Sequence, residues 1–588
     1  MSHKPYKDFE PDWYTEVAPK DSYRYYMKWG DPAFNKPPKE GLYKLVKKIF
    51  GLTDEDFKNR RYLGLEKIDF DIPCTLSAEQ IKTFKDIVGE ENVAEDKISR
   101  ASVCYGKTML DILRLRHNII ENAPDIVIYP STTEEVVKIV DFCKKEKINI
   151  YVYGGGSSVT RGPEAVKRGS VTLDLRKNFN KVISFNEKNQ TITVQPGMSG
   201  PALEKLLNDA PKTLGAKRRY TCGHFPQSFE YSSVGGWAVT RGAGQNSTYY
   251  GKIEDIVISQ EYVTPAGGII KTDPVPRKAC GPSIDQIMMG SEGAFGVLTE
   301  VTLKVFRFHP EDRVRFCYIF KSWEEGQEAM REVMQGEFGF PSAFRLSDEE
   351  ETSFMLHLYS VEDNIVGKML NTFGYAPGKR CLMLGFNDGD PALQKLIKKR
   401  LAKICKKHGA MALPGAVTKA WEGGRFNDPY MRDNMQDFGI IIDTLECAVD
   451  WDRMQDVYKS VRAYCKSRPK TICTTHISHC YPQGANLYFI FVIYTDDIQE
   501  FSDYHSGILD AIQKSGACMS HHHGIGKLFA PWLEGQLGSD EMNILRALKK
   551  HFDPDNIMNP GGTIGLDLEA DQIVPIDVKW EKGKFRGI

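Results

Sequence analysis

The chain has 588 residues, of which 41% are hydrophobic and 26% are charged, and its formal net charge is −1. That length exceeds one ordinary core, and the composition is typical of a soluble globular protein. The near-zero charge gives no overall field that would attract nucleic acid. No Cys-x-x-Cys pair occurs among the 13 cysteines, which argues against a zinc ribbon or an iron–sulfur site and favours free thiols.

Targeting and membrane-spanning signals are not recognised in the sequence. No run approaches 18 apolar residues, and the N-terminal MSHKPYKDFEPDW lacks the apolar segment of a signal peptide. The chain ends in FRGI and not in the peroxisomal Ser-Lys-Leu. We therefore expect a cytoplasmic protein. The basic segment 395–407 is interpreted as a solvated helix face, with peripheral contact to a membrane as the alternative.

The first half of the chain alternates between strand and helix patterns. Residues 1–100 are rich in aromatic residues, Lys and Pro, and are expected to form a helical and irregular wrap. From Pro124, PDIVIYPSTTEEVVKIVDFCKKEKINIYVYGGGSSVTRG predicts strand, helix, strand and glycine loop, with a capping box of Ser131 and Glu134 at the helix start. VISFNEKNQTITVQPG and DIVISQEYVTPAGGIIKT predict two hairpins, the first followed by a helix from Pro201.

The pattern changes near residue 312. RVRFCYIF, RCLMLGFN, DTLECAVDW and NLYFIFVIYTD read as strands of antiparallel type. Helices are predicted between them at WEEGQEAMREVM, ALQKLIKKRLAKICKKHG and DRMQDVYKSVRAYCK. This alternation is typical of an α+β domain with helices on one face of an antiparallel sheet.

Three separated stretches concentrate glycine. YGGGSSVTRG follows a predicted strand, and consecutive glycines let backbone N–H groups converge on an anion. The stretch is neither a Walker A loop nor a G-x-G-x-x-G fingerprint, and by itself it fits a plain tight turn equally well. SSVGGWAVTRGAGQNSTYYGKIEDIV and MGSEGAFGVLTEVTLKVF add two more glycine-rich segments. Together the three indicate one extended ligand that lies across several turns.

These stretches resemble the FAD-binding half of vanillyl-alcohol-oxidase (PCMH-type) flavoproteins, and HFDPDNIMNPGG resembles the closing motif of that superfamily. The resemblance implies non-covalent FAD, a two-subdomain FAD-binding domain at 101–310 and a C-terminal α+β substrate (cap) domain at 311–540. Residues 1–100 would precede these domains, and 541–588 would return to the FAD domain. The residues expected to bind FAD are Tyr153, Gly154, Gly155, Gly156, Ser157, Ser158, Val159, His224, Gln227, Ser228, Ser232, Ser233, Gly235, Gly236, Thr240, Arg241, Gly242, Ala243, Glu292, Gly293, Gly296 and Val297.

Five further motifs resemble alkyldihydroxyacetonephosphate synthases: YYMKWGD, GHFPQSFEYSSVGGW, PSAFRLSD, YMRD and SHHHGIGKL. That resemblance implies exchange of the acyl group of acyl-dihydroxyacetone phosphate for a fatty alcohol in ether-lipid synthesis, through a covalent adduct at flavin N5. The alternative is an FAD-linked oxidoreductase of a small 2-hydroxy acid or polyol phosphate that passes electrons to a partner. A non-enzymatic binding module would leave these motifs without purpose. We also expect a homodimer.

The histidine cluster in CMSHHHGIGKLFAPW lies too far from the termini to be a purification tag. The related D-2-hydroxy-acid dehydrogenases hold a metal with an H-x6-H pair and a Glu, but the matching positions here are Tyr481, Tyr488 and His522. We therefore expect no metal. The resemblance implies that His523 exchanges a proton at the substrate carbon, a role that suits a group with a pKa near neutrality. Tyr488 would position that proton, while His521 and His522 would shape the loop.

Two more histidines lie close upstream of this segment. His476 and His479 are three residues apart, so a regular strand would direct them to opposite faces, whereas a helix or turn could bring them together. We expect packing or supporting roles for them, with a new metal site as the alternative.

Two arginines are candidates for binding the substrate. Arg432 is expected to hold a phosphate or carboxylate through a bidentate fork, with an ordinary ion pair to Asp433 or a helix surface as the alternative. Arg345 is expected to be either a substrate ligand or a structural residue. The family usually reads Gly-His-Glu-Pro-Asp-Ser, and Phe225 and Gln227 replace the two acids here. This departure leaves the identity of the substrate open.

Overall fold

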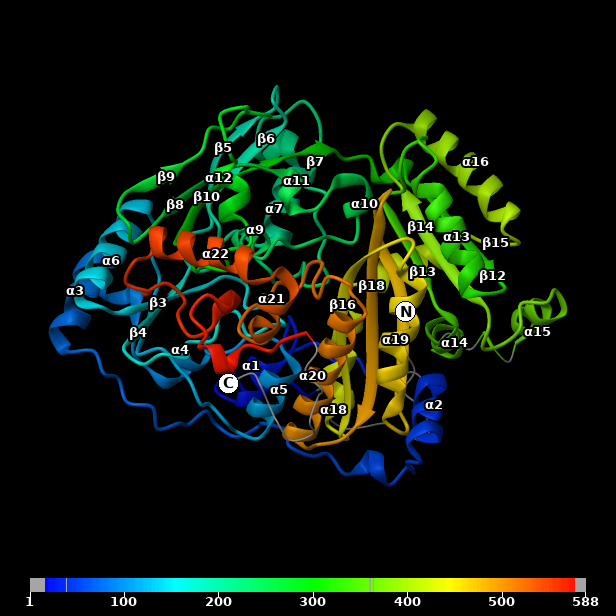
Figure 1. Cartoon of the computed structure of the whole chain (residues 1–588), viewed down its shortest axis with the longest axis horizontal. Helices are drawn as coiled ribbons and strands as arrows, with labels where there is room; N and C mark the ends of the chain where they lie inside the picture. Colours follow the sequence, from blue (N-terminus) through cyan, green and yellow to red (C-terminus); the bar gives the residue numbers. More distant parts are fainter. Residues whose placement is uncertain (1–15, 39, 359–360, 363, 577–588) are drawn as a thin grey trace.

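Two halves of the protein lie side by side in the computed structural model, which describes residues 16–38, 40–358, 361–362 and 364–576. The first half contains a four-stranded and a five-stranded sheet, and the second is built on one seven-stranded sheet (Figure 1). This arrangement confirms the predicted fold class. The N-terminal segment judged to lack a signal peptide (residues 1–13) and the last four residues, FRGI, lie outside the described residues.

The four-stranded sheet carries the first glycine loop. Its order is β1 (Val93–Ala94), β2 (Ile126–Ile128), β4 (Ser170–Asp174) and β3 (Asn149–Tyr153), and β2 and β3 both run parallel to β4. Helix α6 (Thr133–Glu146) connects β2 to β3 as predicted.

The start of α6 differs by one residue from the prediction. Thr132 is the N-cap, because its extended backbone lets the side chain accept the N–H of Glu135. The Ser131 N–H instead donates to the Glu135 carboxylate at 2.6 Å. The predicted box of Ser131 and Glu134 is therefore wrong by one position, since the neighbouring Thr offers an equivalent hydroxyl.

The five-stranded antiparallel sheet contains both predicted hairpins. Its order is β5 (Val182–Asn186), β6 (Thr191–Val194), β10 (Val297–Lys304), β8 (Val257–Val263) and β9 (Ile269–Lys271). Helix α7 (Gly200–Asn208) follows the first hairpin, with Ser199 as its cap and proline in its first turn. The sequence signals for turn and cap therefore predicted this region correctly.

The seven-stranded sheet of the second half, which we call the cap sheet, is antiparallel throughout. Its order is β15 (Met411–Leu413), β12 (Val314–Phe320), β14 (Cys381–Asn387), β13 (Ala343–Ser347), β17 (Ile472–Cys480), β18 (Gly484–Tyr494) and β16 (Ile440–Asp450). Helices α13 (Trp323–Met334), α16 (Pro391–Lys407), α19 (Met454–Ser467) and α20 (Ile498–Lys514) contact these strands.

Helices cover both faces of this sheet, whereas the sequence had led us to expect helices on one face only. Leu382 and Leu384 pack with Trp421 of α17 (Ala416–Gly424) and Met355 of α14 (Glu349–Leu358), whereas Met383 belongs to the main core. Side chains alternate along a strand, so α14 and α17 lie on the face opposite α13. The β17, β18 and β16 end of that second face contributes the side chains of the candidate site.

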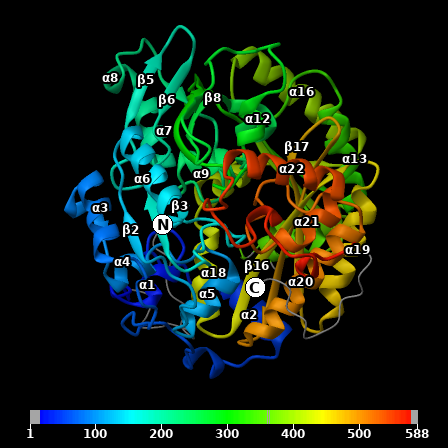
Figure 2. The same cartoon turned by 60° about the vertical axis from the view of Figure 1, so that its left-hand side comes forward.

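The C-terminal segment crosses back onto the first half at α22 (Ser539–Phe552), as Figures 1 and 2 show, after α21 (Ala530–Leu537), which still packs against α20. Beyond α22, Ile150 of β3 donates its N–H to the Ile557 carbonyl at 2.7 Å and accepts the N–H of Asn559 at 2.8 Å. The chain thus closes against the strand that leads into the first glycine loop. Among the described residues, no helix is long and apolar enough to cross a bilayer.

One buried carboxylate joins the N-terminal region to the cap. Asp437 follows α18 (Asp428–Gln436) and accepts hydrogen bonds from Arg24 at 2.9 Å and from Arg116 at 2.8 Å, with Arg60 at 3.3 Å. The Asp437, Arg24 and Arg116 side chains are at most 4% exposed. Burial alone would raise the pKa of Asp437, but Arg116 and Arg24 lower it.

We predict that Asp437→Asn destabilises the protein by about 3–5 kcal/mol, because it leaves buried guanidinium groups without their counter-charge. A thermal melt followed by circular dichroism measures this effect. Asp86→Asn is the control, since Asp86 forms only an exposed pair with Lys82. Equal melting temperatures for the two variants would contradict the structural role of Asp437.

Candidate active site

The first glycine loop presents free backbone donors. Within the described part of the chain, none of the six N–H groups of residues 154–159 donates a hydrogen bond. A Cβ on Gly154 would come within 2.3 Å of Ser233 Oγ, and one on Gly155 within 2.3 Å of the Tyr231 carbonyl. Glycine is therefore required for this loop to lie against the second glycine-rich segment, and its N–H groups remain available to an anion.

The third glycine-rich segment joins the first through the C-terminal part of the chain. The Glu292 carboxylate accepts the N–H groups of Ile525 and Gly526, both at 2.7 Å. Lys527 Nζ donates to the Gly162 carbonyl at 3.1 Å and to Asn559 Oδ1 at 2.7 Å. Burial raises the pKa of Glu292 to about 7 and lowers that of Lys527 to about 7. All three glycine-rich stretches and the histidine loop thus meet in one place.

These features fit FAD. The unused N–H groups of residues 154–159 suit a diphosphate, as at other glycine-rich anion sites. His224 is fully buried, and neither of its ring nitrogens has a hydrogen-bond partner among the described residues. Burial lowers the pKa of His224 to about 3, so its ring is neutral. Its Nε2 lies 3.7 Å from where a Cβ on Gly242 would be, which places it against the expected flavin-lining loop.

Three expected FAD ligands have other structural surroundings: the side chains of Arg241 and Val297 are engaged elsewhere, and Gly296 lies in the close approach of two strands. The Arg241 guanidinium donates to Gln286 and is 41% exposed. Val297 begins β10, pairs with Val263 and lies in the core, and a Cβ on Gly296 would come within 2.4 Å of the Val263 carbonyl. Gly296 and Val297 therefore stabilise the sheet, because the glycine lets β10 approach β8 closely and the valine packs in the core.

The histidine loop is held by a buried carboxylate that our sequence analysis missed. Glu446 of β16 accepts the backbone N–H groups of His521, His522 and His523 at 2.9–3.0 Å, and the Ser520 hydroxyl at 3.1 Å. Its side chain is 0% exposed. An acidic residue inside the otherwise apolar strand segment LECAV was the available signal.

His476 and His479 both reach this cluster although they lie on one strand. A β-bulge interrupts β17 between Ser478 and Cys480, and His479 has a φ of 52°. His479 stacks on His522 with ring centres 4.7 Å apart, and His476 stacks on Tyr488 at 4.9 Å. Our expectation that a strand would separate the two was wrong, because the bulge inserts one residue and restores a common direction.

Tyr488 and His523 meet inside the cluster. Their ring centres are 5.5 Å apart in an edge-on arrangement, and the Tyr488 hydroxyl donates to Thr444 Oγ1 at 3.1 Å. Burial raises the pKa of Tyr488 to about 12. Burial lowers the pKa of His523, while Glu446, whose Oε1 is 3.9 Å from His523 Nδ1, raises it. The cluster therefore combines neutral imidazoles with one adjacent negative charge.

The same side chains could hold a metal ion in principle. One ligand atom each from Glu446, His521 and His522 lies within 4.8 Å of the others. However, Glu446 already accepts hydrogen bonds from the loop, and His521 Nε2 is 2.8 Å from the Tyr481 hydroxyl. Tyr481 and Tyr488, the two tyrosines that we expected in place of metal-binding histidines, both contact histidines of the cluster.

Arg432 of α18 has donors that no other residue uses among those the structure describes. Its side chain is 8% exposed, and Nη1 donates to the Lys107 carbonyl at 3.2 Å. Nε and Nη2 have no hydrogen-bond partner among the described residues, and Nε is 3.7 Å from Asp433. The guanidinium lies 5.1 Å from the Trp29 ring. The ion pair with Asp433 therefore leaves part of the fork free for an anion.

Arg345 is largely occupied by another group. Its Nη2 donates to Glu351 at 2.6 Å, and the same carboxylate lies 3.2 Å from His476 Nδ1. Burial would raise the pKa of Glu351, but Arg345 and His476 lower it to about 2. Arg345 thus orients Glu351 and His476, which favours its structural alternative.

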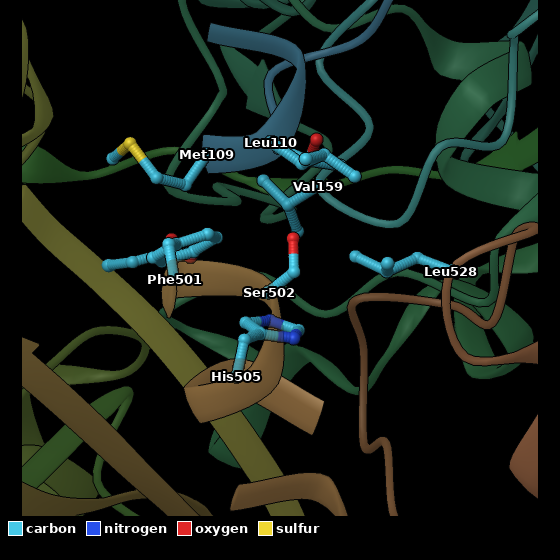
Figure 3. Close-up of a pocket in the computed structure, with 9 residues that line it drawn as sticks. Met109, Leu110, Val159, Phe501, Ser502, His505 and Leu528 are labelled. Atoms are coloured by element: carbon cyan, nitrogen blue, oxygen red, sulfur yellow. The ribbon is translucent and has the colours of Figure 1, made fainter. Parts of the chain in front are cut away.

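A small cavity of about 10 Å³, which has room for about one water molecule, opens next to the first glycine loop (Figure 3). Its walls come from Val159, from the start of α5 (Met109–Arg116), from α20 and from Leu528. The Ser502 hydroxyl points toward Val159, with His505 beside it. Burial lowers the pKa of His505 to about 4. The lining is mixed, with apolar side chains, neutral polar ones and the carboxyl group of Asp443.

The replacements Phe225 and Gln227 lie together beside the loop that precedes α18. Gln227 donates to the Arg425 carbonyl and accepts from Gln245 at 2.7 Å. The Phe225 ring lies 5.1 Å from Phe229 and 5.7 Å from the Arg425 guanidinium. The side chains at these two positions are therefore uncharged and adjoin a buried arginine.

Comparisons with known proteins agree with this arrangement. A family model described as an FAD binding domain matches residues 124–273, and one described as the C-terminal domain of FAD linked oxidases matches residues 309–563. The chain is 30% identical to an alkyldihydroxyacetonephosphate synthase of Dictyostelium discoideum, over 94% of this chain and 93% of that protein. It is 31% identical to YgcU, an uncharacterized FAD-linked oxidoreductase of Escherichia coli K12, over 82% of this chain and 97% of that protein.

Solved structures show the same similarity. An alkyldihydroxyacetonephosphate synthase structure superposes with a TM-score of 0.77 at 26% identity, covering 94% of this chain and 99% of that one. p-Cresol methylhydroxylase, at 16% identity and a TM-score of 0.62, shares the fold over 85% of this chain and 99% of its own. The chain therefore belongs to the FAD-binding, alkyldihydroxyacetonephosphate synthase-like family of FAD-linked oxidases.

Proposed function

We propose that this FAD-dependent enzyme exchanges the acyl group of acyl-dihydroxyacetone phosphate for a fatty alcohol. In that exchange, the bond between the substrate carbon and the carboxylate oxygen breaks, and a bond from the same carbon to the alcohol oxygen forms. The fatty acid leaves as its carboxylate, and the alcohol loses its proton. Bound FAD supplies the reactive ring against which the substrate carbon is held.

The observation that carries the proposal is the position of two groups along β16. Tyr488, which contacts His523, donates to Thr444. The adjacent Asp443 is close enough to Arg432 for the guanidinium to lower its pKa, which burial nevertheless raises to about 6. A proton-transfer group and an anion-binding fork with free donors therefore both adjoin β16, and the 30% identity to a synthase supports a phosphorylated substrate for them.

Each residue then has a definite role. Arg432 binds the phosphate, and His523 removes and returns a proton at the substrate carbon. Tyr488 orients that proton, while His521 and His522 shape the loop under the hold of Glu446. We propose that the cluster acts without a metal ion. The four-part domain division, a homodimer and a cytoplasmic location also stand as proposals.

The second candidate is an FAD-linked oxidoreductase of a hydroxy acid or polyol phosphate that passes electrons to a partner. It is favoured by the 31% identity to YgcU, whose name describes an oxidoreductase. Mixing the enzyme anaerobically with each substrate, while recording the flavin spectrum, separates the two. Persistent bleaching by a hydroxy acid supports oxidoreduction, whereas turnover without an electron acceptor supports transfer.

We predict that Arg432→Ala raises KM by about 30-fold or more, since truncation of one partner of a buried charged pair costs about 2–5 kcal/mol. Steady-state kinetics measures the change. Arg219→Ala is the control, because Arg219 is exposed and pairs only with Glu311 among the described residues. An unchanged KM in a folded Arg432→Ala variant would assign Arg432 to structure.

We predict that His523→Ala lowers kcat by about 10²–10⁴-fold, the usual effect of a positioned proton-transfer group, and leaves FAD bound. Stopped-flow turnover and the flavin absorbance spectrum measure both effects. The exposed His309→Ala is the control. Stoichiometric metal in untagged protein, with activity lost to a chelator and restored by that metal, would refute the metal-free assignment.

We predict that Glu446→Gln lowers kcat by about 10–100-fold. The Glu446 carboxylate accepts the N–H groups of all three histidines, so loss of its charge weakens the contacts that position His523. The acid limb of kcat should lie below pH 6.5 in the wild type, since burial lowers the pKa of His523. Glu446 raises that pKa, so the limb should move to still lower pH in the variant.

The pH dependence of kcat tests this shift. Glu500→Gln is the control, because Glu500 pairs with Arg468 and Thr495 outside the cluster. An acid limb that stays in place in Glu446→Gln would mean that Glu446 does not act on the proton-transfer histidine.

A further inference from the structure

Arg425 is a buried arginine without an acidic partner. Its residue exposure is 6%, and no carboxylate lies within ion-pair distance of it in the described ranges. Nη1 donates to Asn246 Oδ1 at 3.2 Å, and Nε has no partner there. A charge held this way is costly unless an anion accompanies it.

The nearby acids are already committed to other arginines. Asp388 accepts both Nε and Nη2 of Arg313 at 2.6 and 2.9 Å. Glu422 accepts Arg315 Nε at 2.7 Å and also binds Arg313. Three arginines therefore share two carboxylates, and Arg425 carries the excess positive charge. Burial and Arg313 lower the pKa of Arg425, but only to about 10, so its guanidinium remains charged at neutral pH.

Other polar groups beside Arg425 also lack partners. Asn246 is 1% exposed, and its Nδ2 donates no hydrogen bond within the described residues. Because Asn246 Oδ1 binds Arg425 Nη1, this free amide donor adjoins the guanidinium. An incoming anion would thus meet an arginine fork and a second, neutral donor.

The surroundings of Arg425 are aromatic. The rings of Phe225, Phe386, Trp421 and Phe426 lie 4.8–5.7 Å from the guanidinium. Phe229 continues this wall, 5.1 Å from Phe225 and 5.5 Å from Phe426. Four of these rings, those of Phe225, Phe229, Trp421 and Phe426, are only half-buried. A cation at the end of an apolar wall suits an anion that carries a hydrocarbon chain.

We propose that Arg425 and Asn246 bind the carboxylate of the fatty acid released in the exchange reaction, with its chain against Phe225, Phe229 and Phe426. This inference rests on the proposed function and deepens it. The site adjoins the loops around Gln227 and Gln245, which neighbour the expected flavin-lining residues. The phosphate of the substrate and the carboxylate of the leaving group would then each have their own arginine.

Binding of dodecanoate to the FAD-loaded enzyme tests the proposal, measured by calorimetry below the micelle concentration of the fatty acid. Arg425→Gln should weaken dodecanoate binding about 30-fold or more, and Arg425→Lys should weaken it less. Glycerol 3-phosphate affinity should stay unchanged in both variants, because that anion depends on Arg432. Flavin absorbance and a thermal melt establish that each variant is folded and loaded.

Arg315→Gln is the matched control, since it removes one positive charge from the same neighbourhood at a guanidinium already paired with Glu422. Equal loss of dodecanoate binding in Arg315→Gln and Arg425→Gln would reduce the effect to general charge and overturn the site. Unchanged binding in a folded Arg425→Gln, or loss only in Arg432→Ala, would also overturn it. If Arg425→Gln does not fold and Arg425→Lys does, then unchanged dodecanoate affinity in Arg425→Lys would also overturn the site. If the enzyme lacks exchange activity but still binds dodecanoate through Arg425, the proposed function is refuted and the binding site remains supported.

Discussion

The hold of Glu446 on the histidine loop is the interaction on which the candidate site depends. A chain that turns at Gly524 and Gly526, with φ values of 81° and 55°, cannot direct three consecutive imidazoles by its own geometry. One buried carboxylate fixes the backbone of all three by accepting their N–H groups. Charge-assisted hydrogen bonds of this kind are stronger than neutral ones. The strand β16 therefore sets the position of residues that follow it by more than 70 positions.

A second carboxylate connects the same loop to the FAD-binding half. Glu292 accepts the N–H groups of Ile525 and Gly526, directly after the histidines. The loop thus lies between one acid from the cap sheet and one from the third glycine-rich segment. Because the two acids accept mainly backbone N–H groups, His523 Nδ1 is left without a hydrogen-bond partner among the described residues.

Local patterns predicted most of the elements, and tertiary contacts account for the exceptions. Alternating strands, capped helices and hairpin turns around 182–194 and 257–271 depend on near neighbours, so the sequence predicts them well. The bulge that turns His479 toward His522 depends on the pairing of β17 with β18, which no local rule supplies. Glu446 was missed for a related reason: its donors come from a distant segment. The histidines themselves were found because their spacing and glycine flanks are local features.

Arginine shows how the same side chain serves structure or binding according to its partners. Arg24 and Arg116 each donate to Asp437, so both guanidinium groups have a carboxylate partner within the fold. Arg425 is similarly buried but has no carboxylate within ion-pair distance among the described residues, and Arg432 has only Asp433 there, 3.7 Å from its Nε. A fold that buries guanidinium groups in this state is less stable than one that pairs them, and such a cost is typical of functional sites. Because an anionic ligand offsets that cost only when it is bound, the roles that we propose for Arg432 and Arg425 would convert ligand charge into binding energy that the free protein lacks.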